Sequence, residues 1–388
     1  MWKDRVCAYL DEIQDDLIAI SRKIFDTPEL GFQEFETARL LVEHLQSHGI
    51  EVEVGVAGLE TAFRAVHPAE DGPPIIAVLA EYDALPEIGH GCGHNLIATA
   101  ALGAFLAVGS IKEKLPGTLL LLGTPAEEEG GGKITMVSEG VFKEIDAAMM
   151  FHPSSGYTMV NRGSLALTEV RIEFTGKAAH ASASPEQGIN ALDAVIQTFN
   201  GINALRQHIR DGARIHGIIT HGGTKPNIVP DYAAAEFYVR AADNEYCNEL
   251  LEKFENCAKG AALVTGAILS FNTIGHSYQA MKLNRTLGEA FAENLRILNV
   301  PLKPLPKGHS LGSTDMGNVS QVVPAIHPYL EIADESVAGH SKEFAQAAAS
   351  EKGQRAMMNA AKALAMTIVD LLTNSELINQ ARKEFQST

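Results

Sequence analysis

The chain has 388 residues, 46% of them hydrophobic and 20% charged, which is typical of a globular protein of two or three domains and excludes a mainly disordered one. Its 31 basic and 48 acidic residues leave a formal net charge of −17. Because such a field repels phosphate backbones and anionic lipid surfaces, we expect neither a nucleic-acid partner nor a membrane role.

The N-terminus and the cysteines predict a cytoplasmic location. From Met1 the chain runs directly into a charged amphipathic stretch, without the basic, apolar and small-residue pattern of a signal peptide. The longest apolar run, residues 96–111, is shorter than the roughly 18 to 20 residues that cross a bilayer. Four cysteines are too sparse to predict a disulfide framework: Cys7, Cys92, Cys247 and Cys257.

The first part of the chain alternates helices with strands. Apolar residues three and four apart predict a helix over 4–25, and a second is expected over 34–48. Strands are expected at 51–56, 62–66, 75–80, 118–123 and 147–151, with a helix at 96–108. This order predicts a doubly wound α/β sheet, which binds ligands beyond the carboxyl ends of its strands.

From about residue 164 the pattern changes to an inserted α+β domain. Strands are expected at 165–175, 214–220, 233–240 and 267–273, and helices at 189–209 and 246–262. The order β-α-β-β-α-β is that of a ferredoxin-like unit. We therefore predict one domain made of residues 1–163 and 276–388, including helices at 283–298 and 344–372, and a second domain made of residues 164–275.

Cys92 and His94 lie two residues apart, in a Gly-Cys-Gly-His segment whose glycines allow a tight turn around a bound group. A thiolate and an imidazole are metal ligands. By itself the pair is more typical of a buried cysteine and an ordinary loop histidine. A cysteine nucleophile with His94 as its base is a third interpretation.

Three consecutive glutamates, Glu127, Glu128 and Glu129, follow an expected buried strand and precede three glycines. A run of acids is usually a solvated loop. Here the strand edge and the glycines favour a site, because a metal-dependent hydrolase needs one carboxylate to hold metal and another to accept a proton from water.

His152 directly follows an expected strand, and His340 lies in a Gly-His-Ser turn. Each alone is typical of a loop histidine. Taken together, the candidate ligands form one set of five: Cys92, His94, Glu128, His152 and His340. A single catalytic zinc needs about three protein ligands, so five indicate two metals that share ligands, or one full and one partial site.

At this point the sequence resembles the M20 family of metallopeptidases, in particular its amidohydrolase branch. The matching segments are Ala80 to Pro86, Gly89 to Asn95, Gly123 to Glu128, Gly176 to Ala181, Pro226 to Asp231 and Ser313 to Gly317. They span about residues 80 to 340 in the order that the family shows.

The resemblance implies that Cys92, His94, Glu128, His152 and His340 hold two divalent metal ions, zinc or manganese or also cobalt, and that Glu127 is the general base. Glu129 stands where the family has glycine. Glu81 replaces a metal-binding histidine of the wider family, which implies that Asp83 supports the ligands instead of binding metal.

The resemblance also gives the inserted domain the role of a lid and dimerisation domain, and implies a homodimer. His180 resembles a histidine that polarises the scissile carbonyl, in many relatives from the opposite protomer. Asn227 and Arg240 resemble lid residues near the substrate carboxylate. Taken alone, His180 and Asn227 are residue types that are common in loops.

The function expected from this resemblance is metal-dependent hydrolysis of the amide bond of a small N-acyl-amino acid or dipeptide, as in aminoacylases and dipeptidases. A p-aminobenzoyl-glutamate hydrolase is the alternative within the family. Two alternatives of other classes remain: a thiol hydrolase that uses Cys92, and a pseudo-hydrolase that binds metal without catalysis. Chelation separates the metal-dependent enzyme from the thiol enzyme, and the presence of Glu127 disfavours a binding-only role.

Overall fold

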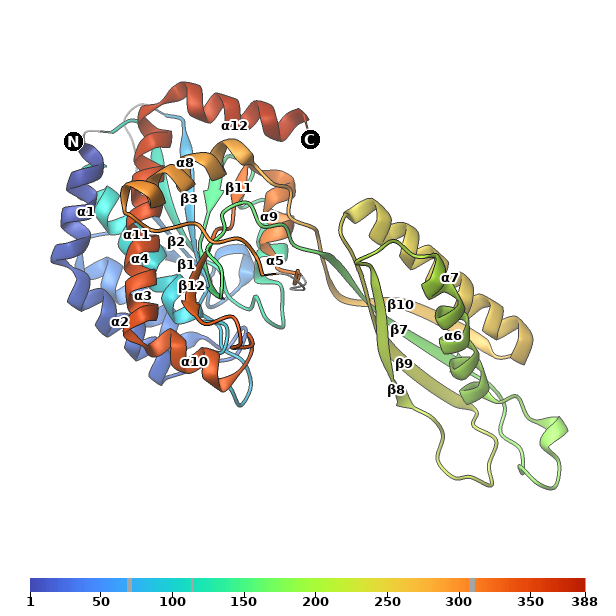
Figure 1. The fold of residues 1–388 in the computed structure, drawn as a ribbon. Coiled ribbons are helices and arrows are strands. Elements are labelled where there is room, and N and C mark those ends of the chain that lie inside the picture. The colour runs from blue at the N-terminus through green and yellow to red at the C-terminus, as the bar shows by residue number, and fades with distance from the viewer. Residues whose placement is uncertain (68–71, 113–114, 307–310, 388) are drawn as a thin grey trace. The chain divides into compact units, whose positions relative to one another are not determined.

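The computed structural model describes residues 1–67, 72–112, 115–306 and 311–387, which form two compact units (Figure 1). Unit 1 contains Met1–Gly163 and most of the chain from Met281 onward. Unit 2 contains Ser164–Ala280, together with a short stretch that ends at Thr314. Both chain ends lie in unit 1 (Figure 1). The predicted α/β class with an inserted α+β unit is confirmed.

Unit 1 is built on a six-stranded sheet with the order β1-β2-β4-β3-β5-β11. Its strands are β1 (Val52–Val54), β2 (Phe63–His67), β3 (Ile75–Ala80), β4 (Thr118–Gly123), β5 (Ala147–Met149) and β11 (Ala325–Ile326). Strands β4, β3, β5 and β11 run parallel, whereas β2 is antiparallel to β4 and β1 is antiparallel to β2. Strand β3 reads as a continuous apolar run because it is central and buried on both faces.

The strand expected at 147–151 ends at Met149. There the chain leaves the large sheet and starts β6 (His152–Ser155), which pairs with β12 (Tyr329–Ala333) in a separate two-stranded sheet. The predicted strand boundary was therefore wrong by two residues, because an apolar pattern does not show which partner a strand takes.

The helices of unit 1 are α1 (Trp2–Glu12), α2 (Gln14–Asp26), α3 (Phe35–Ser47), α4 (His94–Gly109), α5 (Gly132–Ser138), α8 (Arg285–Ile297), α9 (Met316–Val322), α10 (Lys342–Ala349), α11 (Glu351–Thr373) and α12 (Ser375–Ser387). Helix α4 packs on β3 and β4 and is covered by α1, α2 and α11. Its small residues permit this crowding: a Cβ on Gly103 would lie 2.8 Å from Leu17 Cδ1.

Two expected helices are each divided in the structure. The helix predicted over 4–25 is split at Ile13, although backbone hydrogen bonds run on from Ile13 to Tyr9 and from Leu17 to Ile13. The helix predicted over 344–372 is split at Ser350, whose hydroxyl accepts the Gly353 N–H and so starts α11 with an N-cap.

Helix α11 is long and apolar enough to cross a membrane, judged by length and composition alone. However, 78% of its most apolar window is buried inside the protein, where it packs against α1, α4 and α8. The core helix of a globular protein can meet the same criteria of length and apolar composition.

The parallel register brings the candidate site together. Ala80 at the end of β3 pairs with Gly123 at the end of β4, and Val78 pairs with Met149 at the end of β5. The polar segments that follow these strands therefore leave the sheet at one edge, as the sequence predicted.

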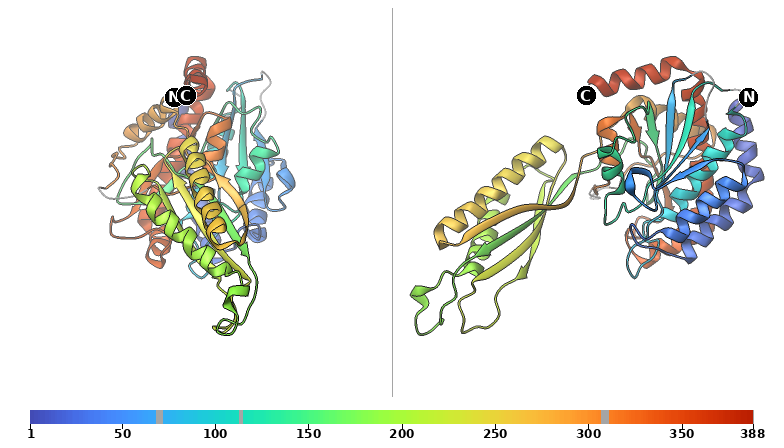
Figure 2. Two further views of the ribbon diagram at one scale, coloured as in Figure 1. Left: turned by 90° about the vertical axis from the view of Figure 1, so that its right-hand side faces the viewer. Right: turned by 180° about the vertical axis from the view of Figure 1, so that it is seen from behind.

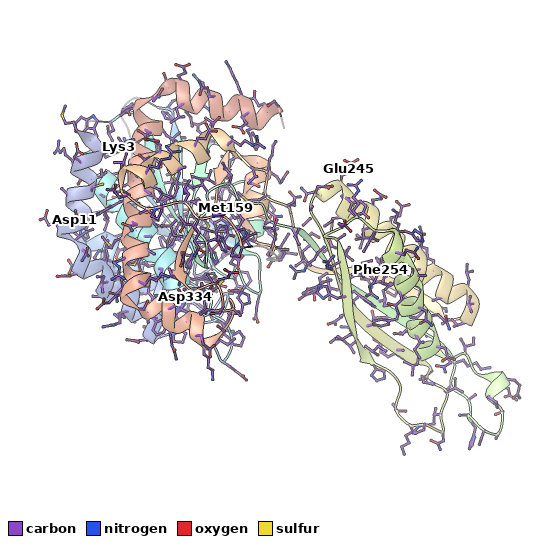
Figure 3. All side chains as sticks on the ribbon, viewed as in Figure 1. Lys3, Asp11, Met159, Glu245, Phe254 and Asp334 are labelled. Carbon is purple, nitrogen blue, oxygen red and sulfur yellow. The ribbon has the colours of Figure 1, made fainter. Side chains whose placement is uncertain are left out.

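Unit 2 is a four-stranded antiparallel sheet with two helices on one face (Figure 2). Its elements are β7 (Ala166–Thr175), α6 (Ala191–Leu205), β8 (Arg214–His221), β9 (Tyr232–Ala241), α7 (Asn244–Thr265) and β10 (Ile268–Tyr278). The strand order is β10-β7-β9-β8, so the predicted β-α-β-β-α-β arrangement is observed. Phe254 of α7 belongs to the apolar layer between the helices and the sheet (Figure 3).

The predicted boundary at residue 275 falls inside β10. That strand stays paired with β7 until Tyr278 meets Leu167, so unit 2 extends to Ala280.

Replacing Phe105 of α4 by Ala tests whether the α4 layer carries the stability of unit 1. Phe105 is fully buried and its ring lies 4.3 Å from the His67 ring. We expect a loss of about 3 to 5 kcal/mol in the free energy of unfolding, measured by urea denaturation. The matched control is Phe35→Ala, because the Phe35 side chain is 51% exposed. This variant should lose far less free energy of unfolding. Equal losses in the two variants would contradict this packing.

Candidate metal centre

Cys92 and His94 are held at the start of α4 by the glycine between them. Gly93 has a φ of 77°, in the left-handed region, and caps the helix. A Cβ at Gly93 would lie 2.6 Å from Pro153 Cγ, so neither the backbone nor the space accepts another residue. The turn places the thiol and the imidazole on the same side of the loop.

The two remaining histidines come from distant parts of the sequence. His152 is the first residue of β6, and His340 lies in the turn before α10. His340 has a φ of 56°, which is rare for a residue other than glycine, and its N–H donates to the Gly91 carbonyl at 3.1 Å. Strained backbone of this kind often marks a functional position.

All five predicted ligands meet in unit 1. Cys92 Sγ lies 3.4 Å from His152 Nε2 and 3.6 Å from His340 Nε2. His340 Nε2 lies 3.5 Å from Glu128 Oε2. Two groups of possible ligands share the thiol, namely Cys92 with His94 and His152, and Cys92 with Glu128 and His340, and within each group the ligand atoms lie within 4.8 Å of one another.

Hydrogen bonds fix how two of the imidazoles face the cluster. His94 Nδ1 donates to Asp83 Oδ1 at 3.0 Å, and His152 Nδ1 donates to the Pro153 carbonyl at 2.6 Å. Each Nε2 therefore faces the cluster, and in the neutral imidazole it is the nitrogen whose lone pair can bind metal. Asp83 also accepts the Glu128 N–H at 2.9 Å, so it orients a second predicted ligand.

Buried polar atoms in the cluster lack hydrogen-bond partners among the described residues. They are His94 Nε2, Glu128 Oε1 and Glu81 Oε2. His94 Nε2 lies 3.8 Å from Glu128 Oε1 and 3.6 Å from Glu81 Oε2, too far for good hydrogen bonds. Because unsatisfied buried groups are costly, this set of nitrogen, sulfur and oxygen donors fits a bound cation.

The protein surroundings shift the pKa values of the acids at the cluster. Burial, reinforced by the nearby carboxylates Glu81 and Glu128, raises the pKa of Glu127 well above its usual range. Burial also raises the pKa of Glu128, against the opposing effect of His94. Removal from water, with the Glu128 carboxylate adding to it, raises the pKa of the Cys92 thiol. Crowding of buried acids contributes to these raised pKa values, so a cation bound among them would lower the pKa values and stabilise the charged forms.

A buried lysine neutralises the acids behind Glu127. Lys133 Nζ contacts the Glu81 carboxylate and donates to Asp315 Oδ1 at 2.7 Å, and the Lys133 N–H donates to Asp315 Oδ2 at 3.0 Å. Lys133, Glu81 and Asp315 are each less than 2% exposed. Burial raises the pKa of Asp315 to about 6, with Glu81 contributing, while Lys133 opposes the shift.

Glu34, from the segment before α3, holds the backbone that carries Glu127. Its Oε1 accepts the Ala126 N–H at 2.8 Å, and Ala126 has a φ of 57°. Its Oε2 accepts the Thr61 hydroxyl at 2.9 Å. Burial raises the pKa of Glu34 to about 7. This contact fixes a strained residue next to the predicted base.

Unit 2 carries the other three predicted site residues and divides them between its two ends. The exposed His180 pairs with Ile228 in an isolated bridge, and the Ala181 N–H donates to the Asn227 carbonyl at 3.0 Å, so His180 and Asn227 are neighbours. Arg240 lies at the opposite end of β9 and donates to Ser313 Oγ at 3.1 Å.

The imidazole of His180 is set to act as a donor. Its Nδ1 accepts the N–H groups of Ser182 and Ala183 at 3.3 and 3.2 Å. The ring proton must then lie on Nε2, so this nitrogen can donate a hydrogen bond.

Sequence reasoning missed Lys133, Asp315 and Glu34 as parts of the site. Lys133 follows the glycine run and Asp315 lies in a matching segment, so the position of each charged residue within or beside a motif was a usable signal for both. Glu34 carried no signal, because it lies far from every motif. The exposed Glu129 lies outside the cluster of possible ligands.

Comparisons with known proteins show what the chain is similar to. A family model described as a peptidase dimerisation domain matches residues 162–265. An Xaa-Arg dipeptidase of Mus musculus is 40% identical over 99% of this chain and 92% of its own length. One of the p-aminobenzoyl-glutamate hydrolase subunits of Escherichia coli is 38% identical over 73% of this chain and 62% of its own length.

Among solved structures, a dinuclear metal-binding peptidase of the M20 family from Bacillus subtilis has a TM-score of 0.68 at 21% identity. The match covers 93% of this chain and 99% of that one. At this identity it shows the same fold.

Replacing Lys133 by Met tests the buried charge balance. The change leaves Glu81 and Asp315 buried without their cation, so we expect a loss of about 3 to 5 kcal/mol in the free energy of unfolding, measured by urea denaturation. The control is Lys253→Met, which removes an exposed lysine paired with Glu249 and should leave stability unchanged. A Lys133→Met protein as stable as the wild type would show that the two acids are neutral in the folded protein.

Proposed function

We propose that this chain, which belongs to the M20 family of metallopeptidases, hydrolyses the amide bond of small dipeptides or N-acyl-amino acids. The family and the amide-bond hydrolase activity follow from the 40% identity to the Xaa-Arg dipeptidase over nearly the whole of both chains. The observation that carries the proposal for the site is the meeting of Cys92, His94, Glu128, His152 and His340 in two groups that share the thiol.

Two divalent metal ions fit these two groups of ligands. Cys92, His94 and His152 would hold one ion, and Cys92, Glu128 and His340 the other. When bound, the metal pair would supply electrophilic catalysis and a lowered pKa for water. Thiolate and imidazole ligands suit zinc, while the carboxylate also suits manganese, so we propose zinc or manganese, with cobalt as the third candidate metal.

Glu127 is the proposed proton carrier. Its pKa is raised by burial and by neighbouring carboxylates, which moves a carboxyl group toward the neutral range that suits a general base, although bound metal would oppose the shift. Its carboxylate accepts a proton from the attacking water and then donates that proton to the nitrogen of the leaving amine. The C–N bond breaks as this nitrogen is protonated.

His180 is the proposed hydrogen-bond donor to the oxygen of the scissile carbonyl. Its proton lies on Nε2, since Nδ1 accepts two backbone N–H groups. A donor that faces the developing negative charge on this oxygen stabilises the transition state.

The state of Cys92 weighs against a thiol hydrolase. A nucleophilic cysteine needs a lowered pKa, but burial and the Glu128 carboxylate raise the pKa of this thiol. The same raised pKa is compatible with a metal ligand, because a cation displaces the thiol proton on binding. The presence of Glu127 beside the ligands disfavours the metal-binding pseudo-hydrolase as well.

A p-aminobenzoyl-glutamate hydrolase is the second candidate function. It rests on the Escherichia coli relative, of whose length the chain spans less than two thirds. A panel of dipeptides, N-acyl-amino acids and p-aminobenzoyl-glutamate, assayed with metal-loaded protein with and without chelator, decides between the candidates. We also propose a cytoplasmic location, supported by four cysteines that are all free thiols.

The arrangement of unit 2 supports a homodimer. Arg240 pairs with Leu167 at the start of β7, whereas His180 and Asn227 lie beyond its far end, so the two groups are separated by about 26 Å of strand. One copy of unit 2 cannot bring both ends to one small substrate. The edge strand β8 exposes Ile218 and Ile219, which are 65% and 44% exposed and suit pairing with a second copy.

Replacing Glu127 by Gln tests the base. We expect kcat to fall about 100- to 10,000-fold, because general-base catalysis contributes on this scale. Metal content, measured by mass spectrometry, should not change. The control is Glu129→Gln, which removes the neighbouring exposed carboxylate and should keep activity. Glu127→Gln protein with full metal and near wild-type turnover would overturn the assignment.

Mixing two inactive variants tests the dimer. If His180 serves the site of the partner protomer, a mixture of Glu127→Gln and His180→Ala chains, exchanged by mild unfolding, should regain about a quarter of wild-type activity, since half the dimers are mixed and each has one intact site. Each variant mixed with itself is the control. A mixture that stays inactive while mixed dimers form would show that His180 acts within its own chain.

A further inference from the structure

Arg162, at the end of unit 1, lies against two tyrosine rings near the candidate metal centre. Its guanidinium carbon lies 4.3 Å from the centre of the Tyr329 ring and 5.6 Å from that of the Tyr157 ring. Its buried Nε has no hydrogen-bond partner, and Arg162 forms no ion pair with the residues that the structure describes. The two tyrosines support the guanidinium on their faces and leave its N–H groups free for another ligand.

Stacked rings connect Arg162 to the predicted metal ligands. The Tyr329 ring lies 5.1 Å from the His152 ring, and the His327 ring lies 4.9 Å from Tyr329 and 5.4 Å from His152. His152 in turn faces the Cys92 thiol. One tyrosine ring thus separates the guanidinium from a proposed metal ligand.

A second buried atom in this cluster is also unsatisfied. His327 is 3% exposed, and its Nε2 has no hydrogen-bond partner among the described residues, while its Nδ1 lies 3.3 Å from the Tyr329 hydroxyl. Buried polar atoms are almost always paired in native proteins. Two such atoms around one tyrosine, on different segments of the chain, indicate a site whose ligand completes the hydrogen bonding.

The charge of this cluster selects the ligand. It contains a guanidinium, a histidine and two tyrosines, and no carboxylate of the described chain pairs with it. A guanidinium close to a metal centre is repelled unless an anion lies nearby, and its planar fork matches a carboxylate. A dipeptide or N-acyl-amino acid carries a carboxylate one residue beyond the scissile bond, about 3.8 Å of chain.

We propose that Arg162 and His327 form the subsite that binds the free α-carboxylate of the substrate, with Tyr329 and Tyr157 holding the guanidinium in place. This inference rests on the proposed function, because it names a group of the substrate that the metal centre cleaves. It differs from the expectation that Arg240 of unit 2 alone meets the carboxylate. Arg240 already donates to Ser313.

The test compares alanyl-arginine with its C-terminal amide in wild-type, Arg162→Gln and Arg162→Lys protein, all full length and metal-loaded. For Arg162→Gln we expect kcat/KM for the acid to fall about 30- to 100-fold, mainly through KM, and for the amide to change less than about threefold. Arg162→Lys keeps the positive charge but lacks the planar guanidinium, which can donate two parallel hydrogen bonds to a carboxylate. We therefore expect an intermediate loss in kcat/KM for the acid. Arg355→Gln, on the surface of α11, is the control and should behave as wild type.

If Arg162→Gln lowers kcat/KM equally for the acid and the amide, or for neither, the subsite is overturned and Arg162 has only a packing role. Calorimetric binding of both compounds to Glu127→Gln protein gives a readout that does not depend on turnover. If the wild-type protein cleaves neither compound, the proposed function fails for this substrate. The subsite then stands only if the acid binds more tightly than the amide and Arg162→Gln removes the preference, and it fails if neither binds.

Discussion

The structure depends on how negative charge is balanced at the carboxyl edge of the large sheet. The parallel register of β3, β4 and β5 ends three strands together, so Glu81, Asp83, Glu127 and Glu128 converge in a largely buried region. Such a group cannot stay ionised without cations. Lys133 supplies one cation on the side of Glu81 and Asp315, and the unsatisfied atoms of His94 and Glu128 leave room for others. The need to balance these buried carboxylates with cations therefore constrains both the packing at this edge of the sheet and the chemistry of the candidate site.

Much of the fold could be read from patterns in the sequence. Strands β3 and β4 begin and end where their apolar runs do, and the order of elements in unit 2 follows from its alternating patterns. The errors fall where tertiary contacts decide. Ser350 caps α11 and divides an apolar stripe that looks continuous, β5 ends when the chain changes sheets, and β10 outlasts its apolar pattern because β7 keeps pairing with it.

The candidate site was predictable where chemistry and spacing coincide, and not where it depends on three-dimensional support. Cys92, His94, Glu128, His152 and His340 could be assembled from residue type and strand edges, and the structure places them together, while their role as metal ligands stays a prediction. Glu34, which holds Ala126, and Arg162, which stacks on Tyr329, have no sequence signature, because each acts through a contact with a residue distant in the sequence.

The central claim is that two metal ions share the thiolate of Cys92. The most direct test is the metal stoichiometry of purified protein, measured by mass spectrometry for the wild type and for Cys92→Ala, with Cys257→Ala as the control thiol. We expect two ions per chain in the wild type and in Cys257→Ala. In Cys92→Ala we expect the loss of at least one ion, with weakened binding of the other. A Cys92→Ala protein that still binds two ions as tightly as the wild type would contradict the shared role of this thiol.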